Sequence, residues 1–131
     1  MSLEILVVDD DENFLALVKH IFEVYRDANV CDVGDSLTAS TLVEVCKYDG
    51  IFLDLNMPGL DGFELALKIR ATEINKRTPI IVITGEKDLV TLRKARAARA
   101  TFVITKPVDH KALKRIFDAT QGAMWAERRK R

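Results

Sequence analysis

Apolar residues in this chain fall into short continuous runs that alternate with longer segments of helical period. Four of the runs are rich in β-branched residues, which is typical of strands buried on both faces of a sheet. A fifth run alternates between apolar and polar residues, as an edge strand does. We predict strands at residues 4–8, 51–53, 80–83 and 102–104, with the edge strand at 29–33.

Between these runs, apolar residues recur every three or four positions, which predicts helices that cover the sheet. The positions expected to face the sheet, helix by helix, are Phe14, Val18, Ile21 and Tyr25; Leu37, Leu42, Val45 and Cys46; Phe63, Ala66, Leu67 and Ile69; Leu89, Leu92 and Ala95; and Leu113, Ile116, Phe117, Thr120 and Met124. Alternating strands and helices indicate an α/β fold with helices on both faces of a parallel sheet. Because crossovers are right-handed, we predict a doubly wound, flavodoxin-like sheet of five strands in the order 2-1-3-4-5, with five helices.

Composition narrows this picture to one globular domain. The chain has 131 residues, 48% of them apolar, and its formal net charge is zero. A neutral chain gives no global electrostatic reason to bind nucleic acid or acidic lipid. Cys31 and Cys46 are too few for a disulfide framework and are expected to be buried, reduced thiols. No apolar stretch reaches the ~20 residues of a membrane helix, and no signal peptide precedes the first run, so we expect a cytoplasmic protein.

Aspartates follow two of the predicted strands. Asp9 and Asp10 come after the first strand and Asp54 after the third, and these strands are neighbours in the order 2-1-3-4-5. Open parallel sheets bind ligands at this point, beyond the carboxyl ends of the strands. Two carboxylates about 4 Å apart repel by roughly 4 kcal/mol at an effective dielectric constant near 20. Three oxygen donors without His or Cys suit a hard cation such as Mg²⁺. The alternative role, capping a helix, is what we expect of Asp11 and Asp61.

The remaining strand ends complete a site for a phosphoryl group. Thr84 and Gly85 follow the fourth strand, and Lys106 follows the fifth. A carboxylate is able to act as a nucleophile and form an acyl phosphate. A metal ion and a lysine would neutralise the charge that develops on the phosphoryl oxygens. Thr84 offers a hydroxyl donor, and Gly85 leaves room for the group to enter.

Four motifs in this sequence resemble the response-regulator receiver family, the CheY-like domains of two-component signalling. They are ILVVDDD at 5–11, FLDLNMPGLDG at 52–62, IVITGE at 81–86 and TKP at 105–107, and the resemblance runs from residue 3 to about 119. It implies that Asp54 is the phosphoacceptor, supplied by a histidine kinase, a phosphotransfer protein or a small phosphodonor. It also implies that Thr84 and Lys106 bind phosphoryl oxygens and that the bond before Pro107 is cis.

The resemblance further implies a Mg²⁺ site and a lifetime for the phosphorylated state. The implied metal ligands are Asp9, Asp10, Asp54 and the backbone carbonyl of Asn56, with Asp10 bound directly and Asp9 through water. Asn56 and Glu86 would flank the path of the attacking water. Because both are polar and able to orient a water, we predict self-dephosphorylation within seconds to minutes.

The chain departs from the family at the position three residues before the lysine. Many members carry Tyr or Phe there as a rotating switch ring, whereas this chain has Val103, with the aromatic residue next to it at Phe102. Side chains alternate along a strand, so Phe102 should point to the opposite face and serve in ordinary packing. We therefore expect phosphorylation to be read out through the loop after Thr84.

The output surface is expected on the fourth helix, fifth strand and fifth helix, as a partner surface or homodimer contact. A solvated basic face is the alternative interpretation of the charges there, which are Arg93, Lys94, Arg96, Arg99, Lys111, Lys114 and Arg115. We assign residues 1–121 to the receiver domain. Residues 122–131 are interpreted as a C-terminal helix extension, a frayed basic end, or the start of a linker to an output domain. Their charges are too few and too local to predict direct binding of nucleic acid.

Three other classes of protein fit the sequence less well. A haloacid-dehalogenase-type phosphatase needs a second aspartate two residues after the first, where this chain has Asn56, and it usually carries a cap domain. A receiver-like interaction domain without phosphorylation usually lacks an acidic residue, the threonine or the lysine. A flavin site needs a phosphate-cradling loop after the first strand, where this chain has three aspartates. The prediction is therefore a signalling module and not an enzyme, with no membrane contact.

Overall fold

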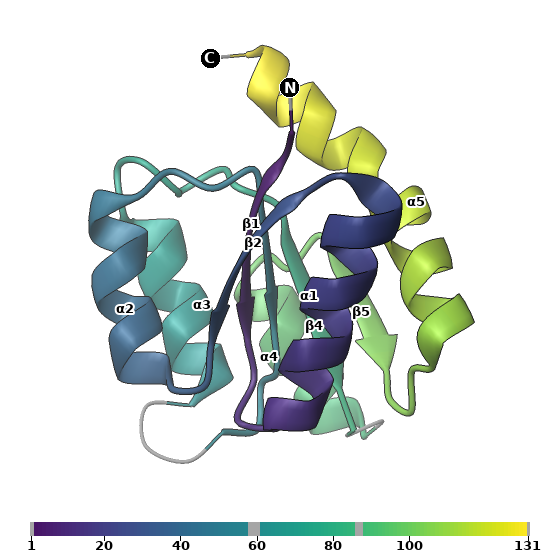
Figure 1. Cartoon of the computed structure of the whole chain (residues 1–131). Helices are drawn as coiled ribbons and strands as arrows, with labels where there is room; N and C mark the ends of the chain where they lie inside the picture. Colours follow the sequence, from purple (N-terminus) through teal and green to yellow (C-terminus); the bar gives the residue numbers. More distant parts are fainter. Residues whose placement is uncertain (1, 58–60, 86–87, 131) are drawn as a thin grey trace.

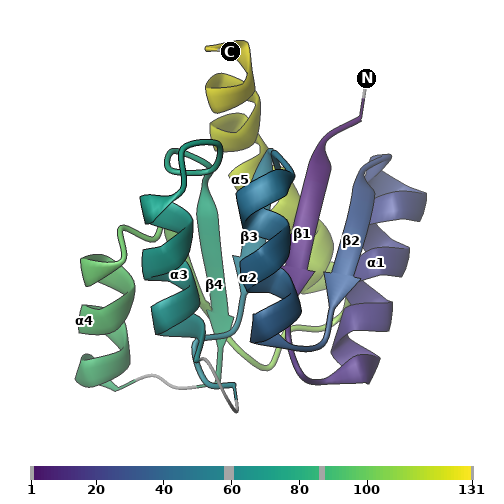
Figure 2. The ribbon, with the colours of Figure 1, turned by 90° about the vertical axis from the view of Figure 1, so that its left-hand side faces the viewer.

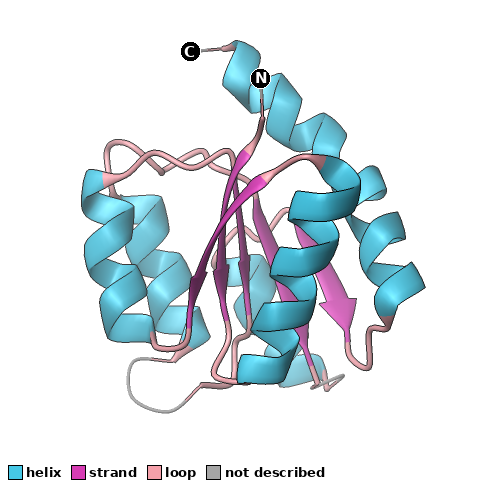
Figure 3. Cartoon of the chain, viewed as in Figure 1, coloured by secondary structure: helices cyan, strands magenta, loops and turns pink. Residues whose placement is uncertain are grey.

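The computed structural model describes residues 2–57, 61–85 and 88–130, which form one parallel sheet covered by helices (Figure 3). The strands are β1 (Glu4–Val8), β2 (Asn29–Val33), β3 (Gly50–Leu53), β4 (Ile80–Thr84) and β5 (Phe102–Thr105). Their order is β2-β1-β3-β4-β5 and every pairing is parallel. The predicted class, strand order and strand positions are confirmed, with one residue added at an end of β3, β4 and β5.

The helices lie in two layers, one on each face of the sheet (Figures 1 and 2). One layer holds α1 (Glu12–Arg26) and α5 (His110–Arg129), and the other holds α2 (Ser36–Val45), α3 (Gly62–Ala71) and α4 (Leu89–Ala97). Each of these helices begins after an aspartate whose carboxylate accepts a backbone N–H of the first turn, as a good N-cap does. The capping residues are Asp11, Asp35, Asp61, Asp88 and Asp109. The predicted caps Asp11 and Asp61 are confirmed.

Two apolar clusters fill the space between the sheet and its helix layers. The α1–α5 side is built around Phe22, whose ring contacts Phe52 of β3 and Phe117 of α5 edge to face, at centroid distances of 5.2 and 4.9 Å. The other side packs Leu6, Val8 and the buried β3 and β4 side chains against α2, α3 and α4. The three central strands are therefore anchored from both faces, which holds their carboxyl ends in fixed positions.

The predicted inward faces of α2 and α4 are wrong in part. In α2, Leu37 and Val45 are 69% and 72% exposed, while Ala39, Ser40 and Val43 face the sheet. In α4 only Ala95 of the predicted face is buried, and Leu89 and Leu92 are exposed. In both helices the small residues Ala39, Ser40 and Ala95 lie against the sheet and its neighbours. Leu37, Val45, Leu89 and Leu92 are left in solvent, so apolar spacing alone selected a stripe that is wrong in part.

Three smaller predictions also need correction. β5 is an edge strand with only part of its surface buried, because no further strand pairs with its outer side in the described residues. Tyr25 of α1 and Leu67 of α3 are exposed instead of facing the sheet. Cys31 and Cys46 are free thiols, as predicted, but both are partly exposed and not fully buried.

The C-terminal helix α5 continues past the end of the sheet on the side where the N-terminus lies (Figure 1). Met124 is fully buried there, at the place where a Cβ on Gly50 would lie. Arg128 donates to a carboxylate oxygen of the buried Asp49 at 3.0 Å and to the carbonyl of Ser2 at 2.7 Å. The extension is thus packed onto the base of the sheet. None of the helices in the described residues is long and apolar enough to span a bilayer.

Candidate functional site

The last backbone bonds of the central strands position two buried carboxylates side by side. The Asp9 N–H donates to the carbonyl of Val33 in β2, and the Asp54 N–H donates to the carbonyl of Val8 in β1, each at 3.1 Å. Both residues therefore leave the sheet where Val8 and Leu53 are register partners. The prediction that strands one and three bring these aspartates together is confirmed.

Asp10 completes an acidic cluster with Asp9 and Asp54. One carboxylate oxygen from each of the three lies within 4.8 Å of the other two. Asp9 and Asp54 are buried, whereas Asp10 is exposed. A cation that enters from solvent would meet Asp10 first and the two buried carboxylates behind it. Oxygen donors alone form this cluster, which is the chemistry that Mg²⁺ prefers.

Lys106 reaches this cluster from the end of β5. Its ammonium lies 2.6 Å from Oδ2 of Asp9 and 3.3 Å from Oδ2 of Asp54, and it sits 4.5 Å from the ring centroid of Phe14. The Lys106 N–H donates to the carbonyl of Thr84 at 2.8 Å, which fixes the chain beside β4. The bond to Pro107 is cis, as predicted. The lysine is thus held by two charges and an aromatic face.

For both partners of the ion pair, Asp9 and Lys106, burial and the opposite charge shift the pKa in opposite directions. Burial raises the pKa of Asp9, and Lys106 only partly offsets it. Burial alone would lower the pKa of Lys106, but the hydrogen bond and charge of Asp9, together with Asp54, outweigh it, so that pKa is raised. One lysine therefore does not fully compensate the buried carboxylate of Asp9.

Thr84 and Asn56 are joined by a side-chain hydrogen bond. The amide Nδ2 of Asn56 donates to Oγ1 of Thr84 at 3.2 Å, and the Asn56 N–H donates to Oδ1 of Asp54 at 3.0 Å. Thr84 is fully buried. Asn56 therefore contacts both the predicted acceptor and the predicted hydroxyl donor. The sequence predicts for Asn56 only a backbone carbonyl ligand and a role toward water, and nothing in it predicts the bond to Thr84.

Gly62 packs its α-carbon directly against the backbone of the predicted phosphoacceptor. A Cβ at this position would overlap the carbonyl oxygen of Asp54, and it would lie 2.5 Å from the α-carbon of Leu55. The Gly62 N–H donates to the carbonyl of Leu55 at 3.0 Å. From the sequence alone, Gly62 is expected only to form part of a turn. The Asp-Gly pair just before a helix was the signal that marked the position.

Phe102 and Val103, where this chain departs from the family pattern, lie in different surroundings. Phe102 packs into the α1–α5 cluster, as predicted, while Val103 is 38% exposed. Glu86, the second residue predicted to flank the attacking water, lies outside the described residues. Arg99, predicted on the fourth helix, follows α4 with a left-handed φ of 56°.

Comparison with known proteins identifies the family to which this site belongs. Residues 5–118 match the model of the response regulator receiver domain. The fold, the aspartate cluster and this match together define a receiver domain of two-component signalling, and the chain belongs to that family.

Individual relatives are similar over most of the chain. Chemotaxis protein CheY-3 of Vibrio cholerae is 32% identical over 117 residues, which cover 89% of this chain and 90% of that protein. Chemotaxis protein CheY of Pseudomonas aeruginosa is 27% identical, with 92% and 100% covered. The cyclic di-GMP phosphodiesterase response regulator RpfG of Xanthomonas campestris is 31% identical, but the match covers only 30% of its length.

Solved structures agree with this assignment. Chemotaxis response regulator CheY4 of Vibrio cholerae superposes with a TM-score of 0.84 at 26% identity, covering 91% of this chain and 98% of that one. The receiver domain of a sensor histidine kinase from Pseudomonas aeruginosa superposes with a TM-score of 0.80 at 28% identity, covering 91% and 97%. That structure is described with a magnesium ion coordinated in its active site cleft.

Proposed function

We propose that this receiver domain accepts a phosphoryl group on Asp54 with the help of Mg²⁺. The observation that carries the proposal is the meeting of Asp9, Asp10, Asp54 and Lys106 at the ends of β1, β3 and β5. A cluster of carboxylates beside a single ammonium suits a reaction in which a dianionic group and a divalent cation enter together.

The residues take distinct parts in the transfer. A carboxylate oxygen of Asp54 attacks the phosphorus, the bond from phosphorus to the donor's nitrogen or oxygen breaks, and the leaving group takes up a proton. Lys106, whose ammonium now lies against two carboxylates, would turn part of its charge to the phosphoryl oxygens. The hydroxyl of Thr84 donates to another of these oxygens once Asn56 releases it. The nucleophile in this step is a carboxylate oxygen of Asp54.

Asp9, Asp10, Asp54 and the backbone carbonyl of Asn56 are the proposed holders of Mg²⁺. The three carboxylates offer oxygens within 4.8 Å of one another, which fits a small hard cation that keeps part of its water. When bound, Mg²⁺ supplies charge neutralisation for the transferred group. The structure of the related receiver domain with magnesium in its cleft supports the choice of metal.

Phosphorylation of Asp54 is testable by intact mass. With acetyl phosphate and Mg²⁺ the protein should gain about 80 Da, the mass of one phosphoryl group. The variant Asp54→Asn should gain nothing, because its amide is not nucleophilic. The matched control Asp27→Asn, at an exposed left-handed position that asparagine tolerates, should be modified like the wild type. An adduct that persists in Asp54→Asn would overturn the proposal, and turnover of an unrelated phosphoester would point to a phosphatase.

We further propose that the signal leaves through α4, β5 and α5 to a histidine kinase, a phosphotransfer protein, an output domain or a second copy. The apolar residues Leu89, Val90, Leu92 and Val103 are exposed on α4 and β5 and support a contact there. The test is charge reversal of Arg96 and Lys114. Self-association or partner binding that is unchanged in this double variant would contradict the proposal.

A further inference from the structure

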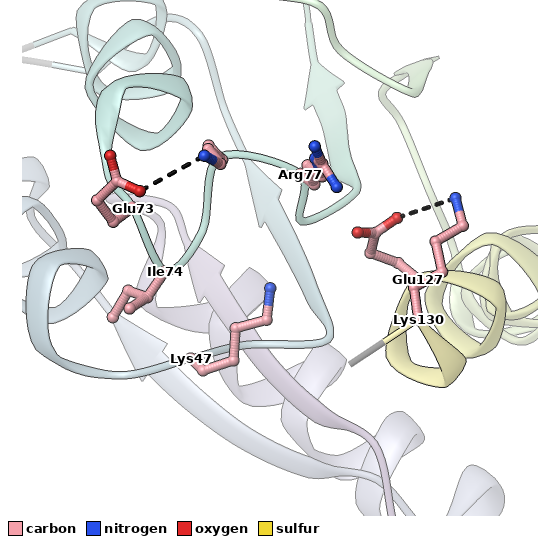
Figure 4. Close-up of a pocket in the computed structure, with 7 residues that line it drawn as sticks. Lys47, Glu73, Ile74, Arg77, Glu127 and Lys130 are labelled. Carbon is pink, nitrogen blue, oxygen red and sulfur yellow. Dashed lines mark hydrogen bonds and ion pairs between the residues drawn. The ribbon is translucent and has the colours of Figure 1, made fainter.

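A cavity of about 380 Å³ opens at the edge of the sheet opposite Asp54. Figure 4 shows Lys47 and Ile74 on one side, Glu127 of α5 and its C-cap Lys130 on the other, and Arg77 between them. The lining residues are Lys47, Glu73, Ile74, Lys76, Arg77, Glu127 and Lys130. Its walls therefore come from three separate segments: the one before β3, the one before β4, and the C-terminal end of α5 together with Lys130.

Positive charge is in excess in this cavity. Four cations face two carboxylates, and both carboxylates are bound by lysines, Glu73 by Lys76 at 3.4 Å and Glu127 by Lys130 at 3.5 Å. Arg77 is exposed and makes no hydrogen bond or ion pair within the described ranges. Within the same ranges, no carboxylate pairs with its five N–H donors. The cavity thus presents an arginine fork whose charge is available to a ligand.

Arg70 does not line the cavity, but it binds the loop that does. Arg70 donates to the carbonyl of Thr78 at 2.7 Å and to the carbonyl of Arg99 at 2.8 Å. Burial and the nearby charge of Arg99 lower the pKa of Arg70 to about 10, although Glu127 acts in the opposite direction. The carbonyl groups that Arg70 binds shape the loop carrying Lys76 and Arg77, so this loop is held in place.

One wall of the cavity lies past the last residue of the family match. Glu127 and Lys130 lie beyond residue 118, where the match to the family ends. Arg128 and Met124 fasten this part of α5 to the base of the sheet through Asp49 and Gly50. The wall is therefore fixed before any ligand arrives, which lowers the entropic cost of binding.

We propose that this cavity binds a small molecule carrying phosphate groups, such as pyrophosphate or a nucleoside polyphosphate. Arginine and lysine are the side chains that bind phosphate oxygens, and the volume lies within the range of small-ligand sites. The charged side chains line one cavity and do not form a stripe along the surface of the protein. Carboxylates at the rim and a net charge of zero disfavour a long polyanion such as DNA. The site does not depend on phosphorylation at the other end of the sheet.

The test is titration of the whole chain with pyrophosphate and with ATP, followed by calorimetry at low salt without divalent metal. Saturable binding of one ligand per chain is expected. Arg77→Ala should weaken it about tenfold, the loss of one charged hydrogen-bonding group, and Arg77→Lys should weaken it less. The matched control Arg93→Ala removes an exposed arginine of α4 that lies away from the cavity, and it should change the affinity less than about twofold.

Three results would overturn the proposal. The first is no saturable binding of either phosphate compound. The second is equal weakening by Arg77→Ala and Arg93→Ala, which indicates diffuse attraction to surface charge. The third is binding of an acidic peptide or a DNA duplex without binding of pyrophosphate or ATP, which indicates a macromolecular partner.

Discussion

At the scale of single residues, the site rests on one lysine that two carboxylates share. Lys106 lies closer to Asp9 than to Asp54, so the proposed nucleophile is the less firmly held of the two. Asn56 in turn holds the hydroxyl of Thr84. Phosphorylation at Asp54 would draw both Lys106 and Thr84 toward new oxygens and change each of these contacts.

Replacing Lys106 by methionine should destabilise the fold. The change leaves the buried Asp9 without its cation, and we expect the free energy of unfolding to fall by about 2 kcal/mol without Mg²⁺. Added Mg²⁺ should recover part of this loss. The measurement is urea unfolding of Lys106→Met beside Lys111→Met, an exposed lysine on α5. Equal losses in the two variants would show that the ion pair contributes nothing.

At the scale of elements, the strands were predictable because short runs of β-branched residues have few other interpretations. All five strands, their order and the meeting of Asp9 with Asp54 followed from these runs and from right-handed crossovers. The inward faces of α2 and α4 did not follow. Ala39, Ser40 and Ala95 are buried by contact with neighbouring elements, which no spacing of large apolar residues records.

Gly62, the first residue of α3, is expected to be essential to the site although it carries no functional group. In Gly62→Ala the new methyl group overlaps the backbone of Asp54, so we expect a loss of about 2 kcal/mol and slower phosphorylation. Gly122→Ala is the matched control. Gly122 lies within the α5 segment, and a Cβ there would contact no neighbouring atom. Alanine at this position should stabilise the protein by up to about 1 kcal/mol. Wild-type stability in Gly62→Ala would refute the close contact.

The N-cap of α2 should contribute to stability in a pH-dependent way. Hydrogen bonds from the backbone and hydroxyl of Thr38 hold the pKa of Asp35 below its usual value. The stabilisation is therefore complete above about pH 4 and is lost as the pH falls through the lower pKa of the folded state. Asp35→Asn keeps a capping side chain without this titration. Its deficit in unfolding free energy relative to wild type should shrink as the pH falls, and a constant deficit would contradict the assignment.

At the scale of the whole molecule, the two ends of the strands carry groups of opposite charge. The carboxyl edge gathers Asp9, Asp10 and Asp54, and the opposite edge gathers the basic cavity and the end of α5. The sequence predicted the first edge through its motifs. It did not predict the second, because the ion pair of Arg128 with Asp49 joins residues that are 79 positions apart in the chain. The boundary at residue 121 stays a prediction, and α5 runs through it without a break.

The end of α5 is expected to stabilise the whole domain. Arg128→Met removes the cation that pairs with the buried Asp49, whose carboxylate also accepts the Glu4 N–H, and we expect the free energy of unfolding to fall by about 2 kcal/mol. Arg129→Met, an exposed neighbour on the same helix, should change stability by less than about 0.5 kcal/mol. Thermal unfolding of the two variants decides the matter. Identical melting temperatures would mean that the extension packs on the sheet without contributing to stability.

The central claim is that Asp54 itself becomes an acyl phosphate, and borohydride trapping tests it most directly. The protein is treated with acetyl phosphate and Mg²⁺, reduced with borohydride and mapped by peptide mass spectrometry. An aspartyl phosphate is reduced to homoserine, whereas a free carboxylate is left unchanged. We expect homoserine at position 54 and none at positions 9 or 10. Homoserine at another aspartate, or none in the presence of both reagents, would contradict it.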